Sequence, residues 1–198
     1  MSNSEHVIKQ NFILASASPR RVELLSQIGI IPDQIIPADV DETPLENEKP
    51  ASLAARLARK KAEKVFLENE GSFVLASDTV VACGNRILGK AIGAQQAYQF
   101  LKLLSGRRHN VYTGVCFITP KGEISVRTVN TVVKFKNMDQ GDLDYYLGQD
   151  EWHGKAGGYA IQGLAARFIR GINGSYSNVV GLPLFETSQL LKGRGYLF

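Results

Sequence analysis

Phe12-Ile-Leu-Ala-Ser-Ala-Ser-Pro-Arg-Arg21-Val-Glu-Leu-Leu25 is the stretch that says most about the fold of this 198-residue chain. Residues 12–15 form a short apolar run that is typical of a buried strand. Ser18 is a good N-cap and Pro19 suits the first helical position, so we expect a helix over residues 19–28, ended by Gly29. The stretch therefore predicts a strand that passes directly into the N-terminus of a helix.

The same helix start has the features of an anion site. Helix N-termini attract anions through their free N–H groups and the helix dipole, and arginines are not expected there on helix grounds. Ser16 and Ser18 add two hydroxyls, and Arg20 and Arg21 add two guanidiniums. A phosphate cradle is one interpretation of this pattern, and a capped helix with two solvated arginines is the other.

Length and composition indicate a globular protein of one domain, which we place over residues 1–198 with a flexible N-terminus over about residues 1–10. The net charge of +4 is compatible with a polyphosphate substrate, but it is too weak to argue for nucleic acid. The sequence has neither a signal-like apolar start nor an 18-residue apolar run, so we expect a cytoplasmic protein without a membrane span. Cys83 and Cys116 lack metal-ligand spacing, which favours two buried thiols.

Strand and helix patterns alternate along the chain, with one antiparallel section, which predicts an α/β fold with a mixed sheet. A Gly-Ser-Tyr-Ser-Asn loop is expected before the last helix. We expect strands over residues 34–38, 73–77, 109–118, 123–135, 159–161 and 167–172, a hairpin over 80–88, and helices over 50–68, 93–104, 139–147 and after Pro183.

Asp78 follows the apolar run of residues 73–77. Ligands bind at the carboxyl ends of strands in open α/β sheets, although an aspartate that starts a turn is the simpler alternative. Glu42 lies in an acidic loop and could share a divalent cation with Asp78, because carboxylates suit Mg²⁺ or Mn²⁺. Taken alone, Glu42 is a solvated loop residue.

Lys61 falls on the apolar face of the helix expected over residues 50–68. A lysine on that face must snorkel, pair with an acid or reach into a site. Lys90 and Lys155 follow glycines, which let a backbone approach a ligand while lysine supplies a charge for phosphate. Each of these signals is weak by itself.

Gln162 carries both a donor and an acceptor, so it could read the edge of a base or be an ordinary turn residue. His109 has the simpler interpretation of a histidine at the start of a strand. No Ser/His/Asp or Cys/His set has recognisable spacing, so the sequence does not support a covalent nucleophile.

Eight segments in this order resemble the Maf family of nucleoside triphosphate pyrophosphatases, and together they span about residues 12–185. They are Leu14-Ala-Ser-Ala-Ser-Pro-Arg-Arg21, Val40-Asp-Glu42, Arg56-Leu-Ala-Arg-Lys-Lys61-Ala62, Ser77-Asp-Thr-Val-Val81, Gly89-Lys90, Val111-Tyr-Thr-Gly-Val115, Lys155-Ala-Gly-Gly-Tyr-Ala-Ile-Gln-Gly163 and Ser177-Asn-Val-Val-Gly-Leu-Pro183. Any one segment is weak, but eight in order are highly specific.

The resemblance implies an elongated α/β fold with a long mixed sheet and a central cleft between two lobes, related to the inosine triphosphatase-like fold. It implies the hydrolysis of a nucleoside triphosphate to the monophosphate and pyrophosphate, with Mg²⁺ or Mn²⁺ as cofactor. Family members are often dimeric, so a homodimer is a further expectation.

The resemblance also implies roles for single residues. Asp78 would be the proton acceptor that activates water, and Glu42 would share the metal with it. Since an ionised aspartate is a weak base, polarisation of the water by the metal must help. Charge on the triphosphate would be neutralised by Arg20, Lys61 and Lys90, and phosphate oxygens would be bound by Ser16 and Ser18.

Substrate choice within the family rests on fewer residues. Arg21, Thr79 and Gln162 resemble the branch that acts on dTTP and UTP, whereas another branch prefers 7-methyl-GTP. Gly158 is a minor variation in the glycine-rich segment. A nucleotide-binding regulator of septum formation is an alternative from a different class, although the Asp78, Glu42 and Lys61 set favours turnover.

Overall fold

The computed structural model describes residues 11–198, so the flexible N-terminus expected over residues 1–10 lies outside the described residues. A seven-stranded mixed sheet forms its centre, in the order β2-β1-β3-β5-β6-β7, with β4 paired to β3. The strands are β1 (Phe12–Leu14), β2 (Gln34–Ile35), β3 (Phe73–Cys83), β4 (Arg86–Leu88), β5 (Arg108–Ile118), β6 (Ile124–Phe135) and β7 (Ile169–Asn173).

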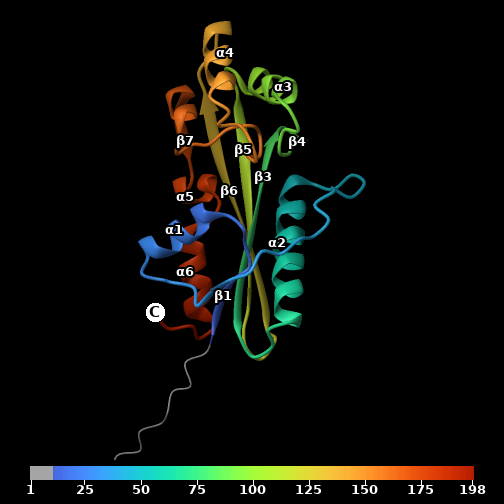
Figure 1. The fold of residues 1–198 in the computed structure, drawn as a ribbon, viewed down its shortest axis with the longest axis vertical. Coiled ribbons are helices and arrows are strands. Elements are labelled where there is room, and N and C mark those ends of the chain that lie inside the picture. The colour runs from blue at the N-terminus through green and yellow to red at the C-terminus, as the bar shows by residue number, and fades with distance from the viewer. Residues whose placement is uncertain (1–10) are drawn as a thin grey trace, which may run out of the picture.

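Helices cover both faces of this sheet (Figure 1). The long α2 lies along one face, while α1, α5 and α6 lie on the other side, and α3 and α4 sit at the far end of the elongated molecule. Their bounds are α1 (Pro19–Gln27), α2 (Pro50–Leu67), α3 (Ala94–Leu104), α4 (Gln140–Gly148), η1 (Leu164–Phe168), α5 (Tyr176–Val180) and α6 (Leu184–Gly193). The α/β class and the mixed sheet predicted from the sequence are confirmed.

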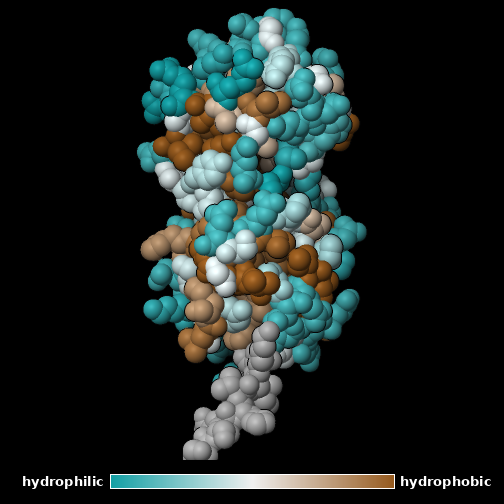
Figure 2. Space-filling view, turned by 60° about the vertical axis from the view of Figure 1, so that its left-hand side comes forward, coloured by the Kyte–Doolittle hydropathy of each residue, from teal (hydrophilic) through white to brown (hydrophobic). Residues whose placement is uncertain are grey.

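Three long antiparallel strands, β3, β5 and β6, run through the length of the molecule. At one end β1 pairs in parallel with β3, and β2 pairs in parallel with β1. Apolar side chains fill the space between sheet and helices on both sides. Figure 2 shows hydrophilic side chains over much of both halves of the surface, with apolar patches between them. Within residues 11–198, no helix is long and apolar enough to cross a membrane.

Several predicted elements need correction. The second strand covers only Gln34–Ile35, and the strand expected to end at residue 77 continues to Cys83, which places Asp78 in mid-strand. No strand forms over residues 159–161: Tyr159 and Ile161 are buried, but by side-chain packing rather than by a ladder. The Gly-Ser-Tyr-Ser-Asn loop gives way to α5, whose five residues are too few to show helical periodicity. Cys116 is buried as expected, whereas Cys83 is only half-buried.

The contact that brings α2 onto the sheet depends on Gly114 in β5. A Cβ placed at Gly114 would lie 2.2 Å from the carbonyl oxygen of Ala54, which belongs to the backbone of α2. Glycine inside a strand often marks such a close approach of another backbone. Gly114 pairs with Asp78 across the ladder, so this contact lies beside the residues of interest below.

We therefore predict that Gly114→Ala lowers the free energy of unfolding by about 3 kcal/mol, because α2 must move away from the sheet. Gly171→Ala is the matched control, since Gly171 is also in a strand and a Cβ there meets nothing within 4 Å. Urea denaturation of both variants measures the difference. Equal stability of the two variants would show that the close contact does not matter.

Candidate active site

A cleft of about 410 Å³ lies midway along the sheet, between the turn after β1 and the glycine-rich segment before η1. All the candidate residues from the sequence line it: Ser16, Ser18, Arg20, Arg21, Glu42, Lys61, Asp78, Thr79, Lys90, Lys155 and Gln162. Five of the lining side chains are cationic and two are carboxylates, so the cleft carries an excess of positive charge. Such a surface favours an anionic ligand.

Lys61 lies at the centre of an ionic cluster at one end of the cleft. Its Nζ donates to Asp78 Oδ1 at 2.5 Å and to Glu42 Oε1 at 2.6 Å. Lys90 Nζ donates to the other oxygen of Glu42 at 3.0 Å. Lys61 and Asp78 are both buried, so the lysine on the apolar face of α2 does pair with acids, which was one of the three expectations for it.

The environment of Glu42 keeps it ionised. Partial burial by itself would raise its pKa, but hydrogen bonds from Lys61 and Lys90 outweigh that effect, and the pKa lies below the ordinary value. Glu42 is therefore a carboxylate at neutral pH. Two carboxylates held together by a shared ammonium form the acidic end of the cleft.

The loop that carries Glu42 is fastened to α2 by Arg56. Its guanidinium meets both oxygens of Glu48, from Nε and Nη2 at 2.7 Å each, and also donates to the carbonyl of Thr43 at 3.0 Å. This two-pronged geometry fixes direction as well as distance. The sequence reasoning assigned no role to either Arg56 or Glu48.

Arg21 holds the turn after β1 in place. Its Nε donates to the carbonyl of Gly181 at 3.0 Å, and its Nη1 donates to Ser16 Oγ at 2.9 Å. Ser77 Oγ donates to the same Gly181 carbonyl at 3.0 Å. Burial lowers the pKa of Arg21 and Asp78 works against that shift, but an arginine stays charged in proteins.

Ser18 occupies the N-cap position of α1, but its side chain makes no capping hydrogen bond, contrary to the expectation from sequence. Instead, Ser16 Oγ accepts from the Ser18 amide at 3.2 Å. Because Ser16 Oγ is also held by Arg21, it is the better-fixed hydroxyl of the pair. The Ser18 hydroxyl is left to face the cleft, which it lines.

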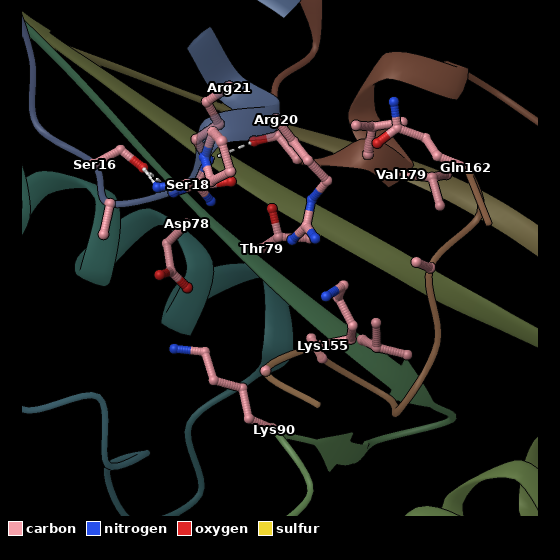
Figure 3. A pocket seen from close by; sticks show the side chains of 18 of the residues that line it. Ser16, Ser18, Arg20, Arg21, Asp78, Thr79, Lys90, Lys155, Gln162 and Val179 are labelled. Carbon is pink, nitrogen blue, oxygen red and sulfur yellow. Dashed lines mark hydrogen bonds between the residues drawn. The ribbon is translucent and has the colours of Figure 1, made fainter. Parts of the chain in front are cut away.

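Beyond the ionic cluster, Arg20 and Lys155 extend into the cleft near Thr79 (Figure 3). Among residues 11–198 neither has a carboxylate within salt-bridge distance. Burial and the neighbouring Arg20 lower the pKa of Lys155, while Glu151 works in the other direction. These two cations are thus available to an anion.

Gln162 and Val179 lie at the far end of the view, beyond Lys155 as seen from Asp78 (Figure 3). The Gln162 side chain is exposed and makes no hydrogen bond within the described part of the chain. Val179 belongs to α5, and the nearby Ile161 and Tyr159 add apolar surface to the cleft. A ligand that spans the cleft therefore meets charges at one end and an apolar wall with a free amide at the other.

A buried polar network, which the sequence reasoning missed, supports the floor of the cleft. Thr79 Oγ1 and Thr113 Oγ1 are 3.0 Å apart, and Thr113 Oγ1 donates to the carbonyl of Asn178 at 3.0 Å. The side-chain amide nitrogen of Asn178 in turn donates to the carbonyl of Val111 and to Thr131 Oγ1. The only sequence signal was that three of the eight family-like segments, 77–81, 111–115 and 177–183, contain residues of this network, whereas Thr131 lies in none of them.

We predict that Lys61→Met lowers the free energy of unfolding by about 3 kcal/mol at neutral pH, because it leaves two carboxylates facing each other without their shared cation. Lys60→Met is the matched control: Lys60 precedes Lys61 on α2 but is exposed, so its loss should cost no more than about 0.5 kcal/mol. Urea denaturation measures both. A similar small cost for the two variants would contradict the stabilising role of Lys61.

Comparison with known proteins agrees with the geometry of the cleft. The family model described as "Maf-like protein" matches residues 11–194. A dTTP/UTP pyrophosphatase of Mesorhizobium japonicum is 55% identical over 195 residues, covering 96% of this chain and 94% of that protein. One from Paramagnetospirillum magneticum is 59% identical over 184 residues, covering 93% and 97%.

A solved structure of a HAM1 protein from Coxiella burnetii also aligns, with a TM-score of 0.44 and 15% identity over 66% of this chain and 75% of that chain. The sequence relatives and the family match are much stronger than this distant likeness of the backbone. They cover almost all the described residues, including every side chain of the cleft named above. The chain therefore belongs to the Maf family.

Proposed function

We propose that this protein is a nucleoside triphosphate pyrophosphatase that hydrolyses dTTP and UTP to the monophosphate and pyrophosphate. The observation that carries the proposal is that the two ends of the cleft differ. One end holds the ionic cluster of Asp78, Lys61 and Glu42, and the other holds the side-chain amide of Gln162. Relatives with 53–59% identity bear the name dTTP/UTP pyrophosphatase, which supports the choice of substrate. The predicted cytoplasmic location and homodimer fit this function and stay predictions.

In the proposed reaction, the oxygen of a water molecule forms a bond to the α-phosphorus of the nucleotide. The bond between that phosphorus and the oxygen bridging to the β-phosphorus breaks, and pyrophosphate leaves. Asp78 takes the proton of the water. Because Lys61 occupies Oδ1 of Asp78, we assign the proton to Oδ2.

The residues present fit a divalent cation such as Mg²⁺ or Mn²⁺. Glu42 and Asp78 supply carboxylate oxygens in a cleft that favours phosphate, and Mg²⁺ commonly takes one or two carboxylates together with substrate phosphates. Residues 11–198 contain no group of three or more acidic, histidine or cysteine ligands, so substrate oxygens would complete the coordination. When bound, the cation polarises phosphoryl oxygens and makes water a better nucleophile.

The remaining cations would bind the triphosphate along the cleft. Within residues 11–198, Arg20 and Lys155 have no acidic partner to compete with phosphate, and Lys90 lies beside Glu42. Stabilisation of charge that develops on the leaving pyrophosphate is the largest effect that such groups contribute to catalysis. The Ser16 and Ser18 hydroxyls would hydrogen-bond phosphate oxygens at the start of α1.

The base would lie at the opposite end, against Val179 and Ile161, with Gln162 reading its edge. An amide can donate and accept at once, as the O4 and N3–H groups of thymine and uracil require. Thr79 and Arg21 are the other two positions predicted to set specificity. Thr79 would act from the floor of the cleft through its hydrogen bond to Thr113, and Arg21 would act from the wall through its hydrogen bond to the Gly181 carbonyl.

We expect metal-dependent release of pyrophosphate that is fastest with dTTP and UTP. The assay uses a panel of dTTP, UTP, CTP, dATP, GTP and 7-methyl-GTP, with Mg²⁺, with Mn²⁺ and with a chelator. Preference for 7-methyl-GTP would keep the reaction but overturn the proposed substrate. Release from none of the nucleotides would contradict the enzyme and favour a nucleotide-binding regulator.

We further predict that Asp78→Asn lowers kcat by at least about 100-fold, because the amide cannot accept the proton of the attacking water. Thermal unfolding of the variant should stay cooperative, and nucleotide should still bind. Asp39→Asn is the control, since Asp39 is an exposed acid just before the Glu42 loop. Normal turnover by Asp78→Asn would refute its assignment as the proton acceptor.

A further inference from the structure

We propose that Glu151 is a positioning residue that holds the segment of residues 160–165 in place and thereby sets the base selectivity of Gln162. The inference rests on the proposed function, in which Gln162 reads the base. Glu151 does not line the cleft, so it would act through the backbone of this segment. Three hydrogen bonds and one close backbone approach point to that role.

The Glu151 carboxylate accepts three hydrogen bonds, which come from two sides. Oε2 accepts from the Leu164 amide at 2.8 Å, and Oε1 accepts from the Ala165 amide at 3.4 Å and from the Tyr146 hydroxyl at 3.1 Å. The two amides are at the start of η1, where N–H groups have no partner within the helix. A charged acceptor is about twice as strong a partner for them as a neutral one.

Tyr146 connects the Glu151 carboxylate to the buried side chains between α4 and η1. The tyrosine belongs to α4, is completely buried, and packs edge-on against Phe168 at the end of η1. Burial, reinforced by the nearby Glu151, raises the pKa of Tyr146, so its hydroxyl remains a donor at neutral pH. Glu151 thus links a rigid helix to the first turn of η1.

Gly163 allows the backbone of this segment to lie directly against the Glu151 carboxylate. A Cβ at this position would lie 2.0 Å from Glu151 Oε2, so a larger residue cannot occupy it without displacing Glu151. Gly163 directly follows Gln162, so the close contact between Gly163 and Glu151 restrains the backbone next to Gln162. The close packing of Gly163 against Glu151 therefore requires a glycine at position 163.

Gln162 depends on such support because nothing holds its own side chain. It is exposed, it lies outside strands and helices, and its amide has no partner among the described residues. On the other side of it, Tyr159 is fixed by a 2.8 Å hydrogen bond between its hydroxyl and His109 Nε2 in a buried aromatic cluster. Glu151 supplies the second anchor, so Gln162 lies between two fixed points.

The decisive experiment compares Glu151→Ala, Gly163→Ala and the double variant with the wild type. The readout is the ratio of kcat/KM for dTTP to kcat/KM for dGTP. We expect each single variant to lower this ratio about tenfold, as Gln162→Ala should, because a misplaced amide loses its preference for the pyrimidine edge. The double variant should be no worse than Glu151→Ala alone, because both changes break one contact.

Two further variants and one further measurement separate positioning from folding. Glu151→Gln keeps the side-chain length and one acceptor oxygen, so its ratio should fall between those of wild type and Glu151→Ala. Glu123→Ala is the control, because Glu123 is an exposed acid that forms a surface ion pair with Arg194, and its ratio should not change. Hydrogen exchange at the Leu164 and Ala165 amides should become faster in Glu151→Ala.

Equal losses of kcat/KM for dTTP and dGTP would overturn the proposal, because they would mean that Glu151 acts through the charge of Lys155 or through stability alone. Unchanged exchange at Leu164 and Ala165 would overturn it as well. A wild type without preference for dTTP would instead refute the proposed function. The wild-type panel, with dGTP added, is therefore measured first, which keeps the two failures distinct.

Discussion

The ionic contact of Lys61 with Asp78 and Glu42 is the constraint on which the rest of the site depends. Three elements far apart in the sequence must meet for it to form: the loop after β2, the middle of α2 and the middle of β3. Lys61 and Asp78 are both buried, and a buried charge is tolerated only when it is paired. Gly114 makes the meeting possible, because it lets the backbone of α2 rest directly on the sheet.

The opposite wall of the cleft is organised around one carbonyl group, that of Gly181. Arg21 and Ser77 both donate to it, so the first turn of α1, the centre of β3 and the end of α5 are joined at a single atom. This arrangement explains why Arg21, despite its charge, is held at the edge of the cleft rather than free within it. Arg20 and Lys155 face the space between the walls, and neither has an acidic partner in the described part of the chain.

Much of the fold could be predicted from local patterns. The helix from Pro19 and the helix from Pro50 begin where the sequence indicates, and the long strands β5 and β6 lie within a residue of their predicted bounds. One prediction failed where side chains are buried but the backbone forms no strand. Tyr159 and Ile161 look like strand residues because they are apolar and buried, yet their backbone joins no ladder.

The sequence by itself determined the class of the fold, the family and the polar and charged candidates that line the cleft, because periodicity and ordered motifs are local properties of the chain. Only the tertiary structure decided which of those side chains are partners. Lys61 meets two acids 17 and 19 residues away, and Arg21 meets a carbonyl 160 residues away. No motif singled out Glu151. Its position is fixed by three hydrogen-bond donors that come together only when α4 and η1 pack against each other. Hydrogen bonds between separate segments leave no periodic pattern in the sequence.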